Sequence, residues 1–292
     1  MTTLLPSTPV DRLAVMSSEV ASLALPLLAT TQAAALACRP FIGRGDSKAA
    51  DGAAVAELRA ALARVPGNVR VVIGEGEKDD APMLYAGEEM GTGDGPACDL
   101  AVDPLEGTKL CARGEDGAVS VLAAAAAAVG KTVDEVAVAI QDRPRHSEMV
   151  AAVRATGAAV VLFADGDVMA SLRVLLPGGD VDMLIGVGGA PEGVITACAT
   201  RALGGGMQGR LAPQSAAEQA RLEEVGVKMD QILNIDDLVA DDDYVFVATA
   251  VTGSTMLGRP ELGPGGWWTT SLVSTPDHPA MIIRGRVGGP AS

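Results

Sequence analysis

Aromatic residues are scarce in this sequence: they make up 2% of its 292 residues, although 48% of the residues are hydrophobic. The core must therefore be built from aliphatic side chains and methionine. Positive charge is also short, with 22 lysines and arginines against 37 acidic residues. Because nucleic-acid backbones attract basic surfaces, this balance argues against a nucleic-acid partner. A small phosphorylated ligand stays possible, since bound cations and a few arginines reverse the sign of the charge locally.

Closely spaced cysteine pairs are absent, because the cysteines stand at positions 38, 98, 111 and 198. This spacing argues against a zinc site or a disulfide framework and fits a reducing cytoplasm. No basic segment followed by an apolar run marks a signal peptide. The longest alanine- and valine-rich run, residues 119–129, is too short to span a bilayer. We therefore expect a cytoplasmic protein with no membrane partner.

Helical and extended patterns alternate along the chain, which is typical of an α/β fold. The first half predicts helices over residues 10–37, interrupted at Pro26, and over 49–65, with strands at 69–73 and 98–102. The second half predicts strands at 135–140, 158–163, 181–187, 244–249 and 280–284, and helices at 147–156, 168–175 and 195–203. Residues 263–266 predict an exposed turn. No long linker interrupts the pattern, so two closely packed halves are expected.

Acidic residues follow the first two predicted strands: Glu75 comes after one, and Asp103 and Glu106 come after the other. Open α/β sheets usually bind ligands at the carboxyl ends of their strands. Carboxylates gathered there supply the oxygen ligands that Mg²⁺ or Mn²⁺ accept. Two such ions about 4 Å apart would activate a water and stabilise the leaving oxygen of a phosphate ester. An Asp-Pro pair alone is commonly a turn, but the acidic loop upstream favours a metal site.

Gly107 and Thr108 add a second requirement of phosphate chemistry. Backbone N–H groups at the start of a helix hold phosphate oxygens, and a threonine hydroxyl can orient an attacking water. Thr108 is equally suited to cap the helix, and the two roles are compatible. Residues 103–108 are therefore expected to form the centre of the active site of a metal-dependent phosphatase.

Eight motifs stand in order along the chain from about Arg39 to the last predicted strand: Gly43-Arg44-Gly45-Asp46, Ala50-Asp51-Gly52-Ala53-Ala54, Ile73-Gly74-Glu75-Gly76-Glu77, Ala81-Pro82-Met83-Leu84-Tyr85, Val102-Asp103-Pro104-Leu105-Glu106-Gly107-Thr108, Arg143-Pro144-Arg145-His146, Asp165-Gly166-Asp167 and Gly188-Gly189-Ala190-Pro191-Glu192-Gly193. Together they resemble the class II (GlpX-type) fructose-1,6-bisphosphatases. The resemblance implies a layered α/β/α/β/α fold of the lithium-sensitive, metal-dependent sugar phosphatases. It also implies a sugar-phosphate substrate and a homo-oligomer, a dimer or a tetramer.

The resemblance further implies roles for single residues. The metal-binding set would be Asp51, Glu75, Asp103, Glu106 and Glu192, and the catalytic set Thr108, Asp51 and Glu106. Asp51, hydrogen-bonded to Thr108, would help to orient a metal-activated water for in-line attack on phosphorus. The substrate-binding set would be Gly107, Thr108, Arg143, Arg145, His146, Asp165, Asp167 and Gly189. Residues 1–130 would then form a metal-binding catalytic half, and residues 131–292 a substrate-binding half.

Simpler roles stay open for two of these groups. The arginines could form surface salt bridges, although the planar guanidinium suits phosphate oxygens. His146 could be a packed or capping residue.

The sequence departs from the family pattern at two places. Ser47 stands where the family usually has a lysine, and Lys48 follows it. After residues 118–122 the chain passes through an alanine-rich run, where family members carry an extra segment that includes a tyrosine in contact with substrate. A site that loses hydrogen-bond donors loses discrimination. We therefore expect hydrolysis to be kept and the substrate to be shifted to another sugar or cyclitol phosphate. The alternative is a catalytically weak phosphosugar-binding or regulatory protein on the same fold.

Overall fold

The computed structural model describes residues 20–74, 84–85, 87–115, 118–122, 135–213, 215–224, 226, 228–229, 231–239, 243–254 and 256–287. Glu75 and most of the alanine-rich run lie outside these ranges. The α-helices are α2 (Ala24–Ala37), α3 (Ser47–Leu62), α4 (Thr108–Arg113), α5 (Ser147–Ala155), α6 (Asp167–Leu175), α7 (Ala190–Ala202), α8 (Ala216–Glu224) and α9 (Ile235–Leu238). Short 3-10 helices cover Ala21–Leu23, Arg39–Phe41 and Pro144–His146.

The strands of the described residues form three sheets. The largest has eight strands: β11 (Glu261–Gly263), β12 (Gly266–Thr275), β10 (Phe246–Ala250), β4 (Val119–Leu122), β3 (Ala97–Glu106), β1 (Asn68–Ile73) and β2 (Glu89–Met90) in this order, with β13 (His278–Val287) paired to β12. A parallel sheet joins β6 (Ala159–Phe163), β5 (Ala137–Gln141) and β7 (Met183–Leu184). The third pairs β8 (Gln208–Gly209) with β9 (Leu233–Asn234). The large sheet therefore combines strands from both ends of the sequence.

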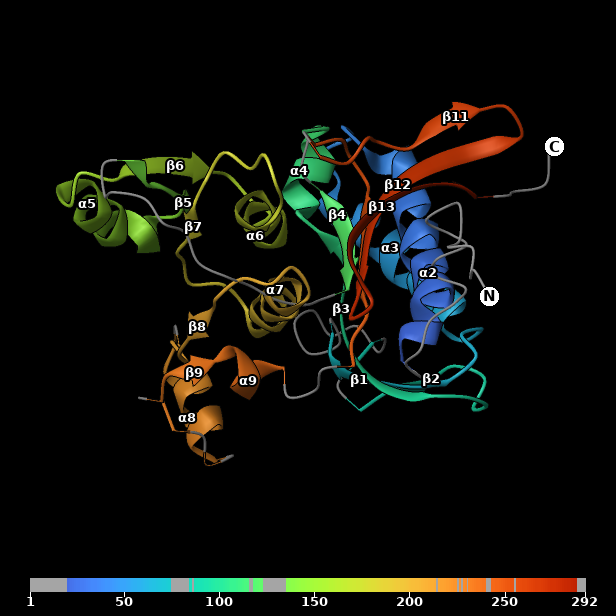
Figure 1. Ribbon diagram of the computed structural model, residues 1–292, viewed down its shortest axis with the longest axis horizontal. Coiled ribbons are helices and arrows are strands. Elements are labelled where there is room, and N and C mark those ends of the chain that lie inside the picture. The colour runs from blue at the N-terminus through green and yellow to red at the C-terminus, as the bar shows by residue number, and fades with distance from the viewer. Residues whose placement is uncertain are drawn as a thin grey trace, which may run out of the picture.

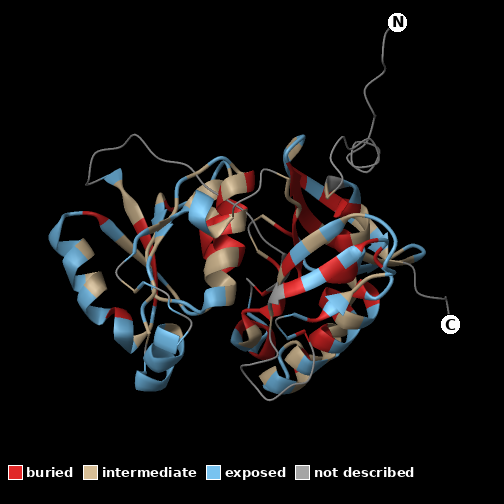
Figure 2. Ribbon diagram, turned by 90° about the horizontal axis from the view of Figure 1, so that it is seen from below, coloured by how far each residue is buried: buried red, intermediate tan, exposed pale blue. Residues whose placement is uncertain are grey.

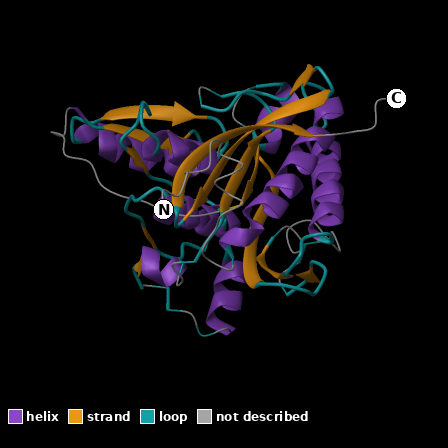
Figure 3. Ribbon diagram, turned by 45° about the vertical axis from the view of Figure 1, so that its right-hand side comes forward, coloured by secondary structure: helices purple, strands orange, loops and turns teal. Residues whose placement is uncertain are grey.

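The elements stack in five alternating layers, which Figure 1 shows from right to left. Helices α2 and α3 cover one face of the large sheet, and α6 and α7 lie on its other face. The small parallel sheet follows, and α5 is the outermost layer. Figure 3 shows the same alternation of helices and strands from another side. The α/β/α/β/α fold expected from the family resemblance is thereby confirmed.

Strand β10 lies at the centre of the core because both of its faces are buried. Side chains of a strand alternate between the two faces of its sheet. Val247 packs with the α2 and α3 side of the core, whereas Phe246 and Ala248 pack with α6 and α7. Thr249 is fully buried as well, and its hydroxyl bonds the Thr31 hydroxyl of α2 at 2.7 Å. Figure 2 shows the buried residues gathered along this sheet and on the helices against it.

Several sequence-based boundaries are corrected by the structure. Pro26 does not interrupt a helix: it lies in the first turn of α2, where its missing N–H costs no helical hydrogen bond. The strand expected at 181–187 is only Met183–Leu184. Helix α7 begins at Ala190 rather than 195, because Pro191 suits the first turn of a helix. The stretch 10–19 lies outside the described residues.

Two further features complete the fold. The turn expected at residues 263–266 is confirmed, because Gly263 pairs with Gly266 where β11 turns into β12. Within the described ranges, no helix combines the length and the apolar composition needed to cross a membrane.

Candidate active site

Strands β1 and β3 run parallel and side by side, so their carboxyl ends meet at one edge of the sheet. Asp103 and Glu106 lie on β3 near this edge, whereas Glu75, two residues beyond β1, lies outside the described residues. The expected neighbourhood of the two acidic motifs therefore stays a prediction. One boundary was wrong: β3 extends to Glu106, so Asp103 lies within the strand and not after it. The register with β4 shifts between Asp103 and Glu106, and the Asp103 Oδ1 atom accepts a hydrogen bond from the Leu105 N–H at 3.0 Å.

Glu106 is a buried carboxylate with an unsatisfied oxygen. Its side chain is 4% exposed, and its Oε1 atom accepts a long hydrogen bond of 3.4 Å from the Val168 N–H. Its Oε2 atom has no hydrogen-bond partner among the described residues. Burial, followed by the charges of Asp103, Asp167, Asp165 and Glu192, raises the pKa of Glu106 well above its usual value. A buried anionic oxygen in acidic surroundings is costly unless a cation compensates it.

Asp165 and Asp167 bring two further carboxylates towards Glu106 from the start of α6. Asp165 Oδ1 accepts hydrogen bonds from the Arg143 guanidinium at 2.6 Å and from the Gln141 Nε2 atom at 3.3 Å. Among the described residues, Asp167 has no comparable donor, and burial, then Glu192 and Asp165, raise its pKa to about 6. The charge of Arg145 opposes that rise. Asp165 is thus held by an arginine, and Asp167 belongs to the acidic cluster.

The loop before α7 approaches the acidic cluster closely because it contains two glycines. A Cβ atom at Gly188 would lie 3.1 Å from the Asp167 Oδ2 atom. A Cβ atom at Gly189 would overlap the Glu192 carboxylate. A Cβ atom at either position would displace the carboxylate that faces it, so glycine lets the loop stay this near to both carboxylates as they stand.

Arg145 and His146 hold this loop in place. The buried His146 ring accepts a hydrogen bond from the Val187 N–H at its Nε2 atom, 3.0 Å away. Its Nδ1 atom lies 2.8 Å from the Gln141 carbonyl and therefore donates to it. Arg145 donates from Nε to the Val187 carbonyl at 3.0 Å. His146 is accordingly engaged with backbone on both sides of its ring, and its contact with substrate stays a prediction.

Gly107 and Thr108 stand where β3 passes into α4. Gly107 has φ +80°, in the left-handed region, and occupies the cap position of α4. Thr108 is therefore the first residue of α4 and not its cap, as the sequence had suggested. A Cβ atom at Gly107 would lie 3.3 Å from the Ala118 Cα atom. The left-handed residue and the tight approach to Ala118 therefore set the direction in which α4 and Thr108 start.

Gly107→Ala is expected to destabilise the protein by about 1–2 kcal/mol and to lower kcat, because the strained turn displaces Thr108. Thermal unfolding and initial rates measure the two effects. Gly52→Ala is the matched control, since Gly52 lies inside α3 with open space around it and should gain up to about 1 kcal/mol. Equal changes in the two variants would contradict the role given to Gly107.

Asp51 lies on α3, next to the helix that carries Thr108. Its charge raises the pKa of the buried Cys38 thiol, behind the larger effects of a hydrogen bond to Cys111 and of burial. Cys38 ends α2 and donates a long hydrogen bond to the Ala50 carbonyl of α3, whereas Cys111 belongs to α4. Asp51 therefore lies within electrostatic reach of Cys38, and its hydrogen bond to Thr108 stays a prediction.

The structure brings most of the expected acids together, but it does not by itself form a complete metal site. Among the described residues, no three side chains are spaced as ligands of one metal ion. Glu75, which lies outside them, was expected to contribute one ligand. The buried Oε2 atom of Glu106 and the clustered carboxylates nevertheless fit hard divalent cations, which take carboxylate oxygens.

Sequence reasoning missed two polar groups near these acids. Gln141 ends β5 and joins Asp165 to Arg145, through Nε2 at 3.3 Å and Oε1 at 3.3 Å. Its place at the carboxyl end of a parallel strand is a signal that could have identified it. Thr196 lies one helical turn after Glu192 on α7, and its buried hydroxyl has no hydrogen-bond partner within the described ranges. No sequence signal distinguishes this threonine from others in helices.

Comparison with known proteins identifies the family of this chain. The model of the family described as bacterial fructose-1,6-bisphosphatase, glpX-encoded, matches residues 21–127 and 122–284. The chain belongs to the GlpX-type fructose-1,6-bisphosphatase family. It is 38% identical over 288 residues to a fructose-1,6-bisphosphatase class 2 of Haemophilus influenzae, covering 81% of this chain and 86% of the relative. It is 37% identical over 287 residues to fructose-1,6-bisphosphatase 1 class 2 of Escherichia coli K12, covering 80% and 85%.

The alignment with the Haemophilus influenzae relative also bears on the internal segment that this chain was expected to lack. It extends over 288 positions, but 81% of this 292-residue chain is only about 237 residues. The difference leaves about 51 positions where the relative has residues and this chain has none. The family model matches this chain in two parts, and the two parts overlap at residues 122–127, at the start of the alanine-rich run. These findings agree with a missing internal segment of that size.

Proposed function

We propose that this chain is a metal-dependent phosphatase that hydrolyses a sugar phosphate. The observation that carries the proposal is the buried Glu106 oxygen without a hydrogen-bond partner, in the field of four more carboxylates. Such a cluster calls for cations when it is ionised, and Mg²⁺ or Mn²⁺ is the proposed choice. The proposal is supported by the two relatives above, which are named as class 2 fructose-1,6-bisphosphatases.

The proposed metal ligands are Asp51, Glu75, Asp103, Glu106 and Glu192. Bound there, divalent cations would polarise the phosphoryl oxygens and make water a better nucleophile. The chain's own contribution is to hold its ligands rigidly. Asp103 is fixed by the Leu105 N–H, and Glu106 by the Val168 N–H at the start of α6.

The proposed catalytic residues are Thr108, Asp51 and Glu106. The Thr108 hydroxyl donates a hydrogen bond to Asp51, and its oxygen then accepts one from the attacking water, which fixes the line of attack on phosphorus. No covalent intermediate is required. The proposed substrate-binding residues are Gly107, Thr108, Arg143, Arg145, His146, Asp165, Asp167 and Gly189.

Release of inorganic phosphate from a panel of sugar and cyclitol phosphates, with Mg²⁺, with Mn²⁺ and with a chelator, tests the activity. We expect turnover that depends on the added metal. Tight binding of an ester without release of phosphate from any member of the panel would favour a phosphosugar-binding protein on the same fold. In that case the proposed activity is wrong.

We also propose that the preferred substrate is shifted away from fructose 1,6-bisphosphate. The reason is the absence of about 51 positions that the Haemophilus influenzae relative has. Loss of substrate-side hydrogen-bond donors weakens discrimination more than it weakens hydrolysis. Values of kcat/KM across the panel decide this point. Preference for fructose 1,6-bisphosphate with a kcat/KM on the order of 10⁵ M⁻¹s⁻¹ would contradict the shift.

Arg145→Ala is expected to raise KM by about 10- to 100-fold and to lower kcat by less. The substitution removes a cation from the proposed substrate side and one support of the Val187 carbonyl. Arg154→Ala is the matched control, because Arg154 is exposed on α5 and carries the same charge. A larger loss in kcat than in KM would mean that Arg145 acts on the transition state.

A homo-oligomer, a dimer or a tetramer, and a cytoplasmic location are the remaining proposals. Sedimentation equilibrium on the full chain measures the first. A mass equal to one 29.5 kDa chain at every concentration would contradict it.

A further inference from the structure

Gln141 is a buried polar residue that the roles proposed above do not use. It ends strand β5 and is 5% exposed. Its carbonyl accepts hydrogen bonds from the Arg143 N–H at 2.9 Å and from the His146 Nδ1 atom at 2.8 Å. Across the small parallel sheet, Gln141 is paired with Phe163 of β6. The backbone of Gln141 is therefore held on both sides, which fixes the point from which its side chain starts.

The side-chain amide of Gln141 joins an anion to a cation. Its Nε2 atom donates to Asp165 Oδ1 at 3.3 Å, and its Oε1 atom accepts from Arg145 Nη2 at 3.3 Å. This orientation of the amide satisfies both partners, because an ionised carboxylate only accepts hydrogen bonds and a guanidinium only donates them. An amide makes both contacts without adding a charge. A carboxylate in its place would repel Asp165 and neutralise Arg145.

The two arginines beside Gln141 differ in how their charge is compensated. Arg143 is half-buried and donates to Asp165 Oδ1 at 2.6 Å, so it is paired with a carboxylate. Arg145 is exposed and, among the described residues, donates only to oxygens without formal charge, a backbone carbonyl and the Gln141 amide. Burial raises the pKa of Asp167 and the charge of Arg145 opposes this rise, but in the described part of the chain no hydrogen bond joins the two side chains. The hydrogen bonds of Arg145 therefore orient its guanidinium and leave its positive charge for a phosphate group.

We propose that Gln141 is a positioning residue of the substrate site. Its neutral amide fixes Arg145 and leaves the charge of that arginine for a phosphate group of the substrate, while it keeps Asp165 engaged with Arg143. An arginine that is already fixed loses less conformational freedom when it binds a phosphate. This inference rests on the proposed function, which places Arg145 on the substrate side.

Phosphorus NMR of glucose 6-phosphate measures the binding without turnover. A chelator is present, and the broadening of the phosphate resonance in a titration gives Kd for the parent and for each variant. Excess glucose, which has no phosphate group, should not displace the ligand. Release of phosphate from the panel described above is measured separately, with metal. If no member of the panel is hydrolysed, the proposed activity is wrong, but the comparison of Kd values still decides the role of Gln141.

Gln141→Glu should raise Kd by at least about tenfold, because the new carboxylate pairs with Arg145 and repels Asp165. Gln141→Met keeps the size of the side chain without hydrogen bonds or charge, and it should raise Kd by about threefold. In turnover, both variants should raise KM and change kcat by less than about twofold. Gln219→Glu makes the same change on the exposed surface of α8 and should alter neither constant. Thermal unfolding checks each fold, and Gln141→Met decides alone if Gln141→Glu does not fold.

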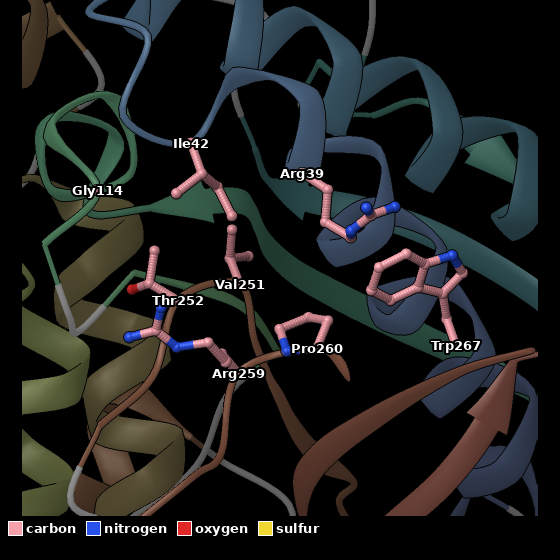
Figure 4. A pocket seen from close by; sticks show the side chains of 8 residues that line it. All are labelled: Arg39, Ile42, Gly114, Val251, Thr252, Arg259, Pro260 and Trp267. Atoms are coloured by element: carbon pink, nitrogen blue, oxygen red, sulfur yellow. The ribbon is translucent and has the colours of Figure 1, made fainter. Parts of the chain in front are cut away.

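A double-mutant cycle in kcat/KM separates positioning from a general loss of structure. In the Arg145→Ala background, Gln141→Glu should have little further effect, because no cation is left to neutralise. Arg39→Ala is the matched background. Figure 4 shows Arg39 against the Trp267 ring, in a pocket whose lining includes neither Gln141 nor Arg145, so the full effect of Gln141→Glu should persist there.

Four outcomes overturn the role proposed for Gln141. The first is the absence of saturable broadening in the parent up to about 10 mM glucose 6-phosphate. The second is an unchanged Kd in Gln141→Glu or, where that variant does not fold, in Gln141→Met. The third is a loss of affinity in Gln141→Met as large as in Gln141→Glu. The fourth is an effect of Gln141→Glu that is as large in Arg145→Ala as in Arg39→Ala.

Discussion

Asp103→Asn is expected to lower metal-supported kcat/KM by at least about 10³-fold, because the ions would lose one of their proposed anionic ligands. The side chain is 7% exposed and lies on the same strand as Glu106. An asparagine keeps the size of the side chain and can still accept the hydrogen bond from the Leu105 N–H. The loss should therefore come from the charge and not from the fold. Phosphate release at saturating Mg²⁺ or Mn²⁺ measures it.

Asp99→Asn is the matched control for this experiment. Asp99 lies four residues earlier on β3, is exposed, and pairs with Arg70 on the sheet surface. Exposed ion pairs contribute little, so activity should stay within about twofold of the parent. The metal-induced rise in Tm should vanish in Asp103→Asn and persist in Asp99→Asn, since a ligand stabilises only a chain that binds it. Near-normal turnover in Asp103→Asn would contradict the proposed metal site.

Glu106→Gln is expected to stabilise the metal-free protein at pH 8 and to remove the response to metal. The folded-state pKa of Glu106 is raised well above its unfolded value of 4.5. A carboxyl with a raised pKa binds more protons in the folded chain than in the unfolded chain. The stability of the metal-free protein is therefore lost as the pH rises from that unfolded value through the folded-state pKa. Glutamine carries no charge and avoids this loss.

Asp167 contributes to the same pH dependence, because its pKa rises from 3.8 to about 6. Its share of the loss between pH 4 and pH 7 is on the order of 2–3 kcal/mol, which is roughly 5–10 °C in Tm. Thermal unfolding of the parent and Glu106→Gln, at pH 5 and pH 8, with chelator and with Mg²⁺, gives the complete comparison. The parent should gain from Mg²⁺ more at pH 8 than at pH 5, because protons compete with the cation.

Glu88→Gln is the control variant for which we expect the opposite change in the stability of the metal-free protein. Glu88 is buried to a similar extent, at 5% exposure, but its carboxylate accepts hydrogen bonds from Arg59 at 2.8 Å and from the Leu84 N–H. Removing a paired buried charge leaves its partner unsatisfied, so this variant should be destabilised with or without metal. If Glu106→Gln is instead destabilised in the presence of chelator, the charge of Glu106 is already balanced by a partner in the metal-free protein, and the prediction is wrong.

The helices and strands were predicted most accurately where the periodicity of apolar residues agreed with the residues that start or end an element. Strand β1 and helix α3 were predicted to within a few residues. The apolar run of β1 and the helical spacing of apolar residues in α3 each end at a clear turn. Strand β12 was missed, since threonines and serines fill much of it. Thr269 and Ser271 are nevertheless fully buried, and Ser271 bonds the Thr249 hydroxyl at 2.8 Å. Polar side chains that satisfy one another across strands leave no apolar pattern to detect.

The pairing of distant segments also lay beyond the sequence. Strand β4, next to the alanine-rich run, pairs with β10, more than a hundred residues later. The division at residue 130 into a metal-binding and a substrate-binding half stays a prediction. The large sheet combines strands from either side of that residue.

By itself, the sequence determined the family, the layered fold and the string of acids from Asp103 to Glu106, because motif order and residue chemistry are local properties. Only the tertiary structure decided which of these groups lack partners. Hydrogen bonding and desolvation depend on neighbours far away in sequence, as with the Val168 N–H at Glu106.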